Sequence, residues 1–282
     1  MNPLEINLII CAGACVGVWL LSILTGDTSW VDRIWSIIPF MYLWVFACSA
    51  HLHSITLNLM AVVATMWGAR LTFNFARKGG YSGMEDYRWE VLRQSMSKTQ
   101  FQLFNIFFIT IYQNILLLLI TLPAWTVFQH HQGSWANTTS SPTVSVWVYV
   151  IAVLFVLCTL GEMIADQQQW NFHKTKHAQL EAGQTPTANF LTTGLFRYSR
   201  HPNYFFEIAQ WWLLFFIAVV AVGSLWQWTV LGAVLLSLLF EGSTRFTEKI
   251  SRSKYPEYAG YQASTSAVIP WFNKRRSASA GS

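Results

Sequence analysis

Charged residues are scarce in this sequence, since Asp, Glu, Lys and Arg make up only 11% of its 282 residues while hydrophobic residues make up 53%. A soluble globular domain carries about 25% charged residues. So few charges do not suit a surface that faces water, and the composition excludes the usual soluble classes. The sequence therefore predicts an integral membrane protein.

Cysteine is rare as well, and the common cofactor signatures are missing. The four cysteines are Cys11, Cys15, Cys48 and Cys158. Each lies inside an apolar run, where a cysteine acts as a small hydrophobic residue, and His173 with His177 is too little for a metal site. We therefore predict no metal site. The patterns G-x-G-x-x-G and G-x-x-x-x-G-K-[ST] are absent too, so a nucleotide would be held by helix ends and loops.

Long apolar runs are abundant instead. A helix needs about 20 residues to cross a hydrocarbon core of roughly 30 Å. Suitable runs lie at about 4–25, 34–50, 55–77, 101–128, 143–165, 204–222 and 226–244. We predict an all-α integral membrane bundle of about seven transmembrane helices, folded as one domain over residues 1–282.

Lysine and arginine are absent from every second loop, and this absence predicts the topology. The loops at 51–54, 129–142 and 223–225 contain neither residue. All 18 Lys and Arg fall in the other loops, the helix ends beside them and the tail, and such residues collect on the cytoplasmic side. We therefore expect the N-terminus outside and the C-terminus in the cytoplasm.

The same topology accounts for two smaller features. Basic residues at an anionic cytoplasmic leaflet explain the net charge of +5, so no nucleic-acid partner is implied. The first apolar run lacks a basic leader, and we expect no cleavable signal peptide. Asn137 begins a glycosylation sequon on the predicted non-cytoplasmic side.

Polar residues recur at helical spacing toward the predicted cytoplasmic ends of three runs. The three stripes are Glu162, Asp166, Gln169 and His173; Glu241, Arg245, Glu248 and Arg252; and Arg70, Asn74 and Arg77. Ionisable residues are costly in a bilayer and usually face a protein interior or a water-filled cavity. The stripes predict a hydrophilic cavity that opens to the cytoplasm. The alternative is that these helix ends simply emerge into water.

The turn before the sixth run has the character of an anion site. Pro202 suits the first turn of a helix, because its fixed φ is helical and its missing N–H would be unpaired there. Free N–H groups at this helix start, with Arg197 and Arg200 alongside, favour a phosphate. Asn203 and Glu207 are four residues apart and share a face. In the alternative interpretation the arginines extend to lipid headgroups.

Several motifs resemble a known family. "GLFRYSRHPNYFFEIAQWW" and "TEKISRSKYPEYAGYQASTSAVIPWF" resemble the C-terminal region of the steroid 5-alpha-reductase superfamily. "VDRIWSIIP", "WGARLTFNFARKGGYSGMEDYRWEVLR" and "EMIADQQQWNF" are similar to an uncharacterised steroid-reductase-like branch of it. Together they cover most of the chain from Trp30 to Phe272. "RHPNY" alone is also similar to motifs in sterol double-bond reductases and in membrane methyltransferases.

The resemblance implies a seven-helix bundle that holds NADPH in a cytoplasmic-side cavity and a lipophilic enone in a pocket reached from the membrane. It places the cofactor-binding portion at about 145–272, followed by a disordered tail at about 273–282. The cofactor contacts that it implies are Asp166, Arg197, Arg200, His201, Asn203, Tyr204, Glu207, Arg245, Glu248, Lys249, Tyr255 and Tyr258.

The sequence departs from the family at the catalytic acid. The steroid reductases polarise the substrate carbonyl with a Glu and Tyr pair, and the tyrosine position here holds Trp67, which has no acidic proton. Asp32 and Tyr87 are the nearest replacements. A tyrosine with a pKa of about 10 is a competent proton donor at neutral pH, whereas Asp, at about 3.9, needs a large upward shift. The chemistry favours Tyr87.

The leading hypothesis is therefore NADPH-dependent reduction of a carbon–carbon double bond in a steroid-like or other lipophilic enone. A methyltransferase that uses S-adenosylmethionine on a lipid or isoprenylcysteine is an alternative, because it shares the "RHP" turn. A non-catalytic protein that binds lipid or sterol is another, because of Trp67. We expect a lipophilic substrate and membrane lipid as partners and no obligate protein partner. The membrane would be that of the endoplasmic reticulum, or the inner membrane of a bacterium.

Overall fold

The computed structural model describes residues 1–83, 85–131 and 144–272. The Asn137 sequon and the tail at 273–282 therefore lie outside the described residues. Within those ranges the chain is helical and has no strand, apart from an isolated bridge between Ser199 and Ser266. The all-α prediction is confirmed.

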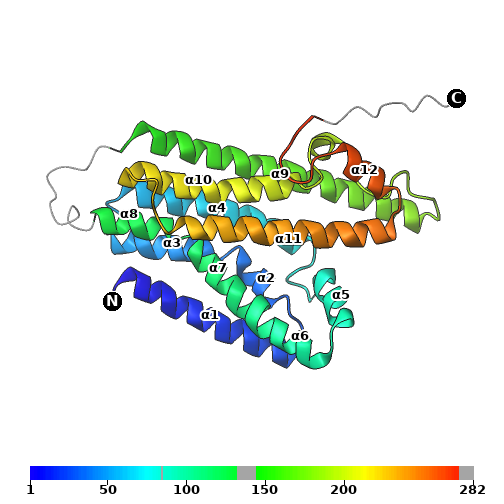
Figure 1. Ribbon diagram of the computed structural model, residues 1–282, viewed down its shortest axis with the longest axis horizontal. Helices are drawn as coiled ribbons and strands as arrows, with labels where there is room; N and C mark the ends of the chain where they lie inside the picture. Colours follow the sequence, from blue (N-terminus) through cyan, green and yellow to red (C-terminus); the bar gives the residue numbers. More distant parts are fainter. Residues whose placement is uncertain (84, 132–143, 273–282) are drawn as a thin grey trace. The chain divides into compact units, whose positions relative to one another are not determined.

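Seven helical segments of the described chain are long and apolar enough to cross a membrane, as the sequence predicts (Figure 1). The segments are α1 (Pro3–Thr25), α2 with α3 (Trp30–Trp35 and Ile38–Ser49), α4 (Ile55–Arg77), α6 with the π-helix η1 and α7 (Lys98–Phe104, Asn105–Tyr112 and Gln113–Leu119), α9 (Val146–Glu181), α10 (Pro202–Val222) and α11 (Val230–Lys254). The shorter elements are α5 (Tyr87–Ser95), α8 (Pro123–His131), η2 (Gly194–Arg197) and α12 (Tyr258–Ser264).

Several helices differ from their predicted limits; the seventh span, α11, continues past residue 244 to Lys254. The apolar run at 101–128 contains two helices, because α7 ends at Leu119 and α8 starts after a short turn at Pro123. Proline lacks the N–H that a continuing helix needs. The fifth span does not end near residue 165 but continues as helix to Glu181.

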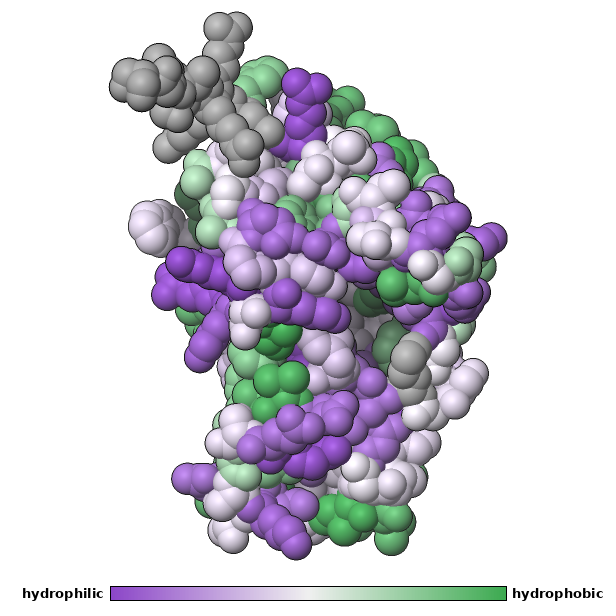
Figure 2. Space-filling view, turned by 90° about the vertical axis from the view of Figure 1, so that its right-hand side faces the viewer, coloured by the Kyte–Doolittle hydropathy of each residue, from purple (hydrophilic) through white to green (hydrophobic). Residues whose placement is uncertain are grey.

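The chain divides into two compact units. The first contains Met1–Leu157 and Gln210–Leu236, and the second contains Cys158–Ala209 and the chain from Ser237 onward. In the first unit α1 packs beside α3, η1 and α7, and α3 packs along α4 (Figure 1). Figure 2 shows one face of the protein on which hydrophilic residues predominate, with smaller hydrophobic patches among them.

Local sequence explains where the helices start. Asn2 caps α1, accepting from the Leu4 N–H at 3.0 Å, and the Glu5 carboxylate accepts the Asn2 N–H in return at 3.1 Å. This reciprocal pair is a capping box. Helix α10 starts at Pro202, where the sequence predicts it.

Candidate functional site

The turn before α10 is paired with the segment that follows α12. The N–H groups of Arg200 and His201 donate to the carbonyls of Ser266 and Ala267 at 2.8 and 3.0 Å. The Ser199 hydroxyl is buried, and its oxygen lies 2.7 Å from the Val268 carbonyl. These contacts lie within the second unit. They fix the start of α10 against the 265–268 segment, so the two form one structural element.

Glu248 on α11 is the central acceptor of this element. Arg200 donates from Nε and Nη2 to the two Glu248 carboxylate oxygens at 2.6 and 3.0 Å. His201 Nε2 lies 3.1 Å from Oε1, and the Gln262 amide donates to Oε2 at 2.7 Å. The Arg200 and Glu248 side chains are only 9% and 10% exposed. A two-point Arg–carboxylate pair is both strong and directional, so Glu248 ties α10, α11 and α12 together.

Arg200 therefore holds neighbouring segments together as well as carrying a positive charge. Its Nη1 donates to the carbonyls of Gln262, at 3.0 Å, and Thr265, in addition to the bonds that Nε and Nη2 make to Glu248. Most of its five N–H donors already have partners. A phosphate beside this turn would be met by the α10 N-terminus and by the exposed Arg197, while Arg200 holds the frame.

Three further acidic residues are buried in the same unit. Glu162 and Asp166 on α9 and Glu207 on α10 are each 4% exposed. Glu162 and Asp166 are four residues apart and share a helix face. The two helices approach closely, because a Cβ on Gly161 would lie 2.5 Å from the Phe206 ring. Buried carboxylates that do not bind a metal can accept hydrogen bonds from the hydroxyls of a ribose.

The remaining predicted contacts are more accessible. Asn203 and Tyr204 are half-buried in the first turn of α10, and the Tyr204 ring stacks on His201 at 5.0 Å between centroids. Arg245 is exposed and pairs with Glu241 at 2.8 Å, and Lys249 is exposed as well. In the stripe on α11, Glu248 is buried, whereas Glu241, Arg245 and Arg252 are exposed.

An aromatic cluster that includes Tyr258 lies near Glu248. Phe190 packs against Tyr255, Tyr258 and Tyr261. Burial first, and then the Glu248 charge, raise the pKa of Tyr258 to about 12, although Arg200 opposes them. Tyr258 therefore stays a neutral phenol at physiological pH.

Tyr255 has the opposite electrostatic environment from Tyr258. Its hydroxyl lies 3.1 Å from the Lys176 ammonium. Burial raises its pKa, but hydrogen bonds from Lys176 and Lys254 outweigh burial, and the net pKa is lowered. The two lysines give this end of the second unit a local positive charge.

The two candidate catalytic residues belong to the first unit. The Asp32 carboxylate, on α2, accepts from Trp89 Nε1 at 3.0 Å. Tyr87 is the first residue of α5 and is 55% exposed. Both lie at the loops that the topology assigns to the cytoplasmic side.

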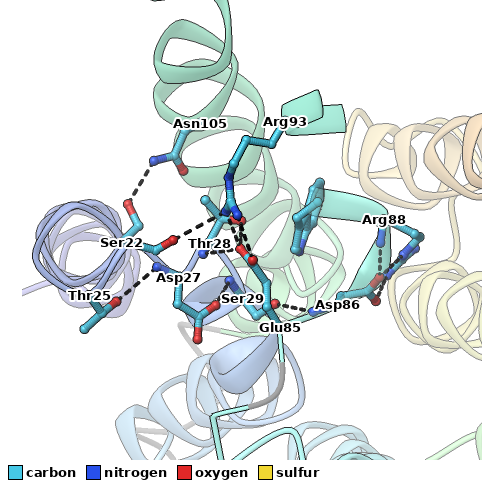
Figure 3. Close-up of polar contacts among 12 residues, drawn as sticks. Ser22, Thr25, Asp27, Thr28, Ser29, Glu85, Asp86, Arg88, Arg93 and Asn105 are labelled. Carbon is cyan, nitrogen blue, oxygen red and sulfur yellow. Dashed lines mark hydrogen bonds and ion pairs between the residues drawn. The ribbon is translucent and has the colours of Figure 1, made fainter. Parts of the chain in front are cut away.

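Charged hydrogen bonds order these two loops (Figure 3). Glu85 accepts from the Thr28 N–H and hydroxyl at 3.0 and 2.8 Å, and from Arg93 at 2.6 Å. The Asp86 N–H donates to the Ser29 hydroxyl at 3.0 Å, and the Asp86 carboxylate caps α5. The segment that carries Tyr87 is thereby held against the α1–α2 connection.

Glu85→Gln should lower stability near neutral pH and make stability less sensitive to acid. Burial raises the pKa of Glu85, but Arg93 and Thr28 outweigh it and the net pKa lies below 4.5. Since the folded pKa is depressed, the stabilisation is present above the unfolded pKa and is lost as pH falls through the folded pKa. We expect a loss of about 1 kcal/mol at pH 7 for this partly exposed pair. Thermal unfolding in detergent between pH 7 and pH 3 measures the stability difference between the variant and the wild type. A difference that does not change with pH would contradict the prediction. Glu90→Gln, at an exposed position on the following helix α5, is the control.

Sequence reasoning missed several members of this site. Gln262, Lys176 and the carbonyls of the 265–268 segment were not predicted, because nothing in their local sequence indicates a partner 14 to 79 residues away. Thr244 was missed as well. It is 3% exposed and lies one turn before Glu248, and its hydroxyl has no hydrogen-bond partner within the described ranges. Its position at i−4 from Glu248 was the available signal.

Comparison with known proteins places the chain in a family. A family profile described as "Protein of unknown function (DUF1295)" matches residues 18–265. An uncharacterised protein of the fission yeast Schizosaccharomyces pombe is 34% identical over 283 residues, which cover 95% of this chain and 80% of that protein. No solved structure matches the chain. A match over most of the sequence, with a relative of this identity, shows that the chain belongs to the DUF1295 family of multi-span membrane proteins.

Proposed function

We propose that this protein is an NADPH-dependent reductase of a conjugated carbon–carbon double bond in a lipophilic enone. The observation that carries the proposal is the combination, within one unit, of the α10 N-terminus with the buried acids Asp166 and Glu207. Helix N-termini bind phosphate, and buried carboxylates bind ribose hydroxyls. A dinucleotide contains both groups. The resemblance to the steroid 5-alpha-reductase superfamily supports the same assignment.

The residues of the second unit have separate roles in this proposal. Glu207 and Asp166 accept hydroxyl groups of the cofactor, Thr244 supplies a further hydroxyl, and Arg197 faces a phosphate together with the α10 N–H groups. Arg200, His201 and Glu248 hold the turn in position. Asn203 and Tyr204, half-buried in the first turn of α10, line the proposed cofactor site. Arg245, Lys249 and Tyr255 form the outer rim of the proposed site, and Tyr258 is buried beside Glu248.

Bound NADPH supplies a hydride for the β-carbon of the enone. Tyr87, in the first unit, is our candidate for the proton donor, because a phenol is a better donor at neutral pH than an ionised carboxylate. Asp32, also in the first unit, is the second candidate, and it accepts a hydrogen bond from Trp89 on α5. We place this activity in the endoplasmic reticulum membrane of a eukaryote or the inner membrane of a bacterium.

Purified protein in detergent should gain thermal stability with NADPH at millimolar concentration. Ligand binding to the folded state stabilises it by RT ln(1 + [L]/Kd), about 2.7 kcal/mol at a hundredfold excess over Kd. Glu207→Gln should weaken NADPH and NADH binding about equally, by roughly 10- to 100-fold, because it removes a charged acceptor worth about 1.5–3 kcal/mol. Glu181→Gln, at the exposed end of α9, is the matched control.

Other outcomes separate the alternatives. A shift with S-adenosylmethionine and none with NADPH would replace the reductase by a methyltransferase. NADPH binding without turnover on any lipophilic enone would leave a non-catalytic protein that binds lipid and nucleotide. If neither cofactor changes the thermal stability, the proposal that this protein binds a nucleotide is wrong.

A further inference from the structure

The short connection between α10 and α11 presents two tryptophans on its outer side. Trp226 is 94% exposed, Trp228 is 59% exposed, and Leu225 beside them is 59% exposed. The connection joins two membrane-spanning helices, which end at Val222 and begin at Val230. An indole ring gains much free energy when it leaves water, so a turn that faced only water would be expected to fold these rings against the protein.

Hydrogen bonds of the turn itself hold the two rings outward. Gln227 and Thr229 alternate with the two tryptophans and are buried, at 9% and 1% exposed. The Gln227 amide donates to the Ser224 carbonyl at 2.8 Å, and its side-chain oxygen lies 2.8 Å from the Thr126 hydroxyl on α8. These residues all belong to the first unit. Since the alternate residues face inward, the structure fixes both indoles on the outer side.

A third exposed tryptophan lies at the start of another span. Trp147 is in the first turn of α9 and is 62% exposed, and its neighbour Val146 is 65% exposed. On the predicted topology, the start of α9 and the α10–α11 connection lie on the same, non-cytoplasmic side. Three separate spans therefore carry or adjoin an exposed indole at the end that faces away from the cytoplasm.

The three indoles have the chemistry of the layer between lipid headgroups and hydrocarbon. An indole combines a large apolar ring with a single N–H donor, and tryptophan is enriched in this layer because one side of the ring can be apolar while the N–H meets polar groups. A protein interface surrounds its aromatic centre with a polar rim, but the 223–229 connection contains no charged residue. The local composition thus favours lipid over a protein partner.

We propose that Trp147, Trp226 and Trp228 form a lipid-contact surface that lies in the headgroup layer of the non-cytoplasmic leaflet. Each is at the end of a membrane-spanning helix or in the short connection between two, so the bilayer itself brings this layer to them. The ester and phosphate oxygens of a phospholipid accept the indole N–H, and the rings lie against the upper part of the acyl chains. The inference is independent of the nucleotide proposal, because the three residues belong to the first unit.

The test uses full-length protein that is labelled with fluorotryptophan and reconstituted in phosphatidylcholine nanodiscs. The variants Trp147→Phe, Trp226→Phe and Trp228→Phe assign the three fluorine NMR signals, and each keeps an aromatic ring at an exposed position. Two spin-labelled phospholipids are compared at equal mole fraction, one with its nitroxide near the headgroup and one with its nitroxide at the end of the acyl chain. A water-soluble gadolinium chelate is the third probe.

The headgroup-level nitroxide should broaden the three signals more than the deep nitroxide does, and the chelate should broaden them only weakly. Trp211 on α10 is 1% exposed, and its signal, assigned with Trp211→Phe, should respond least to the headgroup-level nitroxide. Stronger broadening by the deep nitroxide would place the rings in hydrocarbon, and broadening by the chelate alone would place them in water. No broadening by any probe would show that protein covers the rings. Each of these three results would overturn the proposal.

Discussion

Glu248→Ala should destabilise the second unit by about 3–5 kcal/mol, because it leaves the buried Arg200 guanidinium without its carboxylate. His201 and Gln262 lose their acceptor at the same time. On the proposed function, NADPH binding should disappear with it, since the start of α10 is no longer fixed. Chemical or thermal unfolding in detergent, followed by limited proteolysis, measures the first effect.

A matched control lies on the same helix. Glu241 also pairs with an arginine, Arg245, but both side chains are exposed, at 49% and 79%. Exposed pairs contribute about 0.2–1 kcal/mol, so Glu241→Ala should change little. Similar losses for the two variants would show that Glu248 is not the centre of this element. Glu248→Gln keeps one acceptor oxygen and should fall between alanine and the wild type.

Gly68→Ala is the second change from which we expect a large effect. A Cβ at this position on α4 would lie 2.4 Å from the Ser36 carbonyl and 2.7 Å from the Phe40 ring. The carbonyl is main chain and cannot rotate away, so α4 would have to shift. Overpacking of this kind costs about 1–3 kcal/mol, and Gly68→Leu should cost more.

Gly13→Ala on α1 provides the comparison for Gly68. No atom lies within 4 Å of its Cβ position, and alanine favours a helix over glycine by up to about 1 kcal/mol. The two substitutions should therefore change Tm in opposite directions in one unfolding assay. A stabilising Gly68→Ala would mean that α4 and Ser36 are not in close contact.

The spans could be predicted because their signal is local. Apolar length identified all seven helical segments, and proline placed the start of α10 at Pro202. The break after Leu119 was missed, although Pro123 inside the run from 101 to 128 was a local signal for it. The extension of α9 to Glu181 was not fully anticipated, although the stripe from Glu162 to His173 already had helical spacing.

The site was harder to predict because its contacts are remote in sequence. Arg200 has the same local pattern whether it faces a phosphate or a carboxylate, and its partner Glu248 is 48 residues away. Asn7 and Tyr42 lie in different spans, and only the packing of α1 on α3 brings them together. The residue types indicated where polar groups gather, but the partner of each group could be identified only from the folded structure.

The length of α9 has a consequence for the membrane itself. Its exposed residues are apolar from Val146 to Ile164 and mostly polar beyond that point, with Ala178 and Leu180 as exceptions. At 1.5 Å per residue the apolar part is about 28 Å long, which matches a hydrocarbon core of roughly 30 Å. The remaining turns, to Glu181, are rigid continuations of a membrane span. A much thicker bilayer would draw the polar turns after Ile164 toward hydrocarbon, at a cost of fractions of a kcal/mol per Å. The hydrophobic thickness of the bilayer therefore affects the depth of Glu162 and Asp166 directly, because no loop separates these residues from the apolar part of α9.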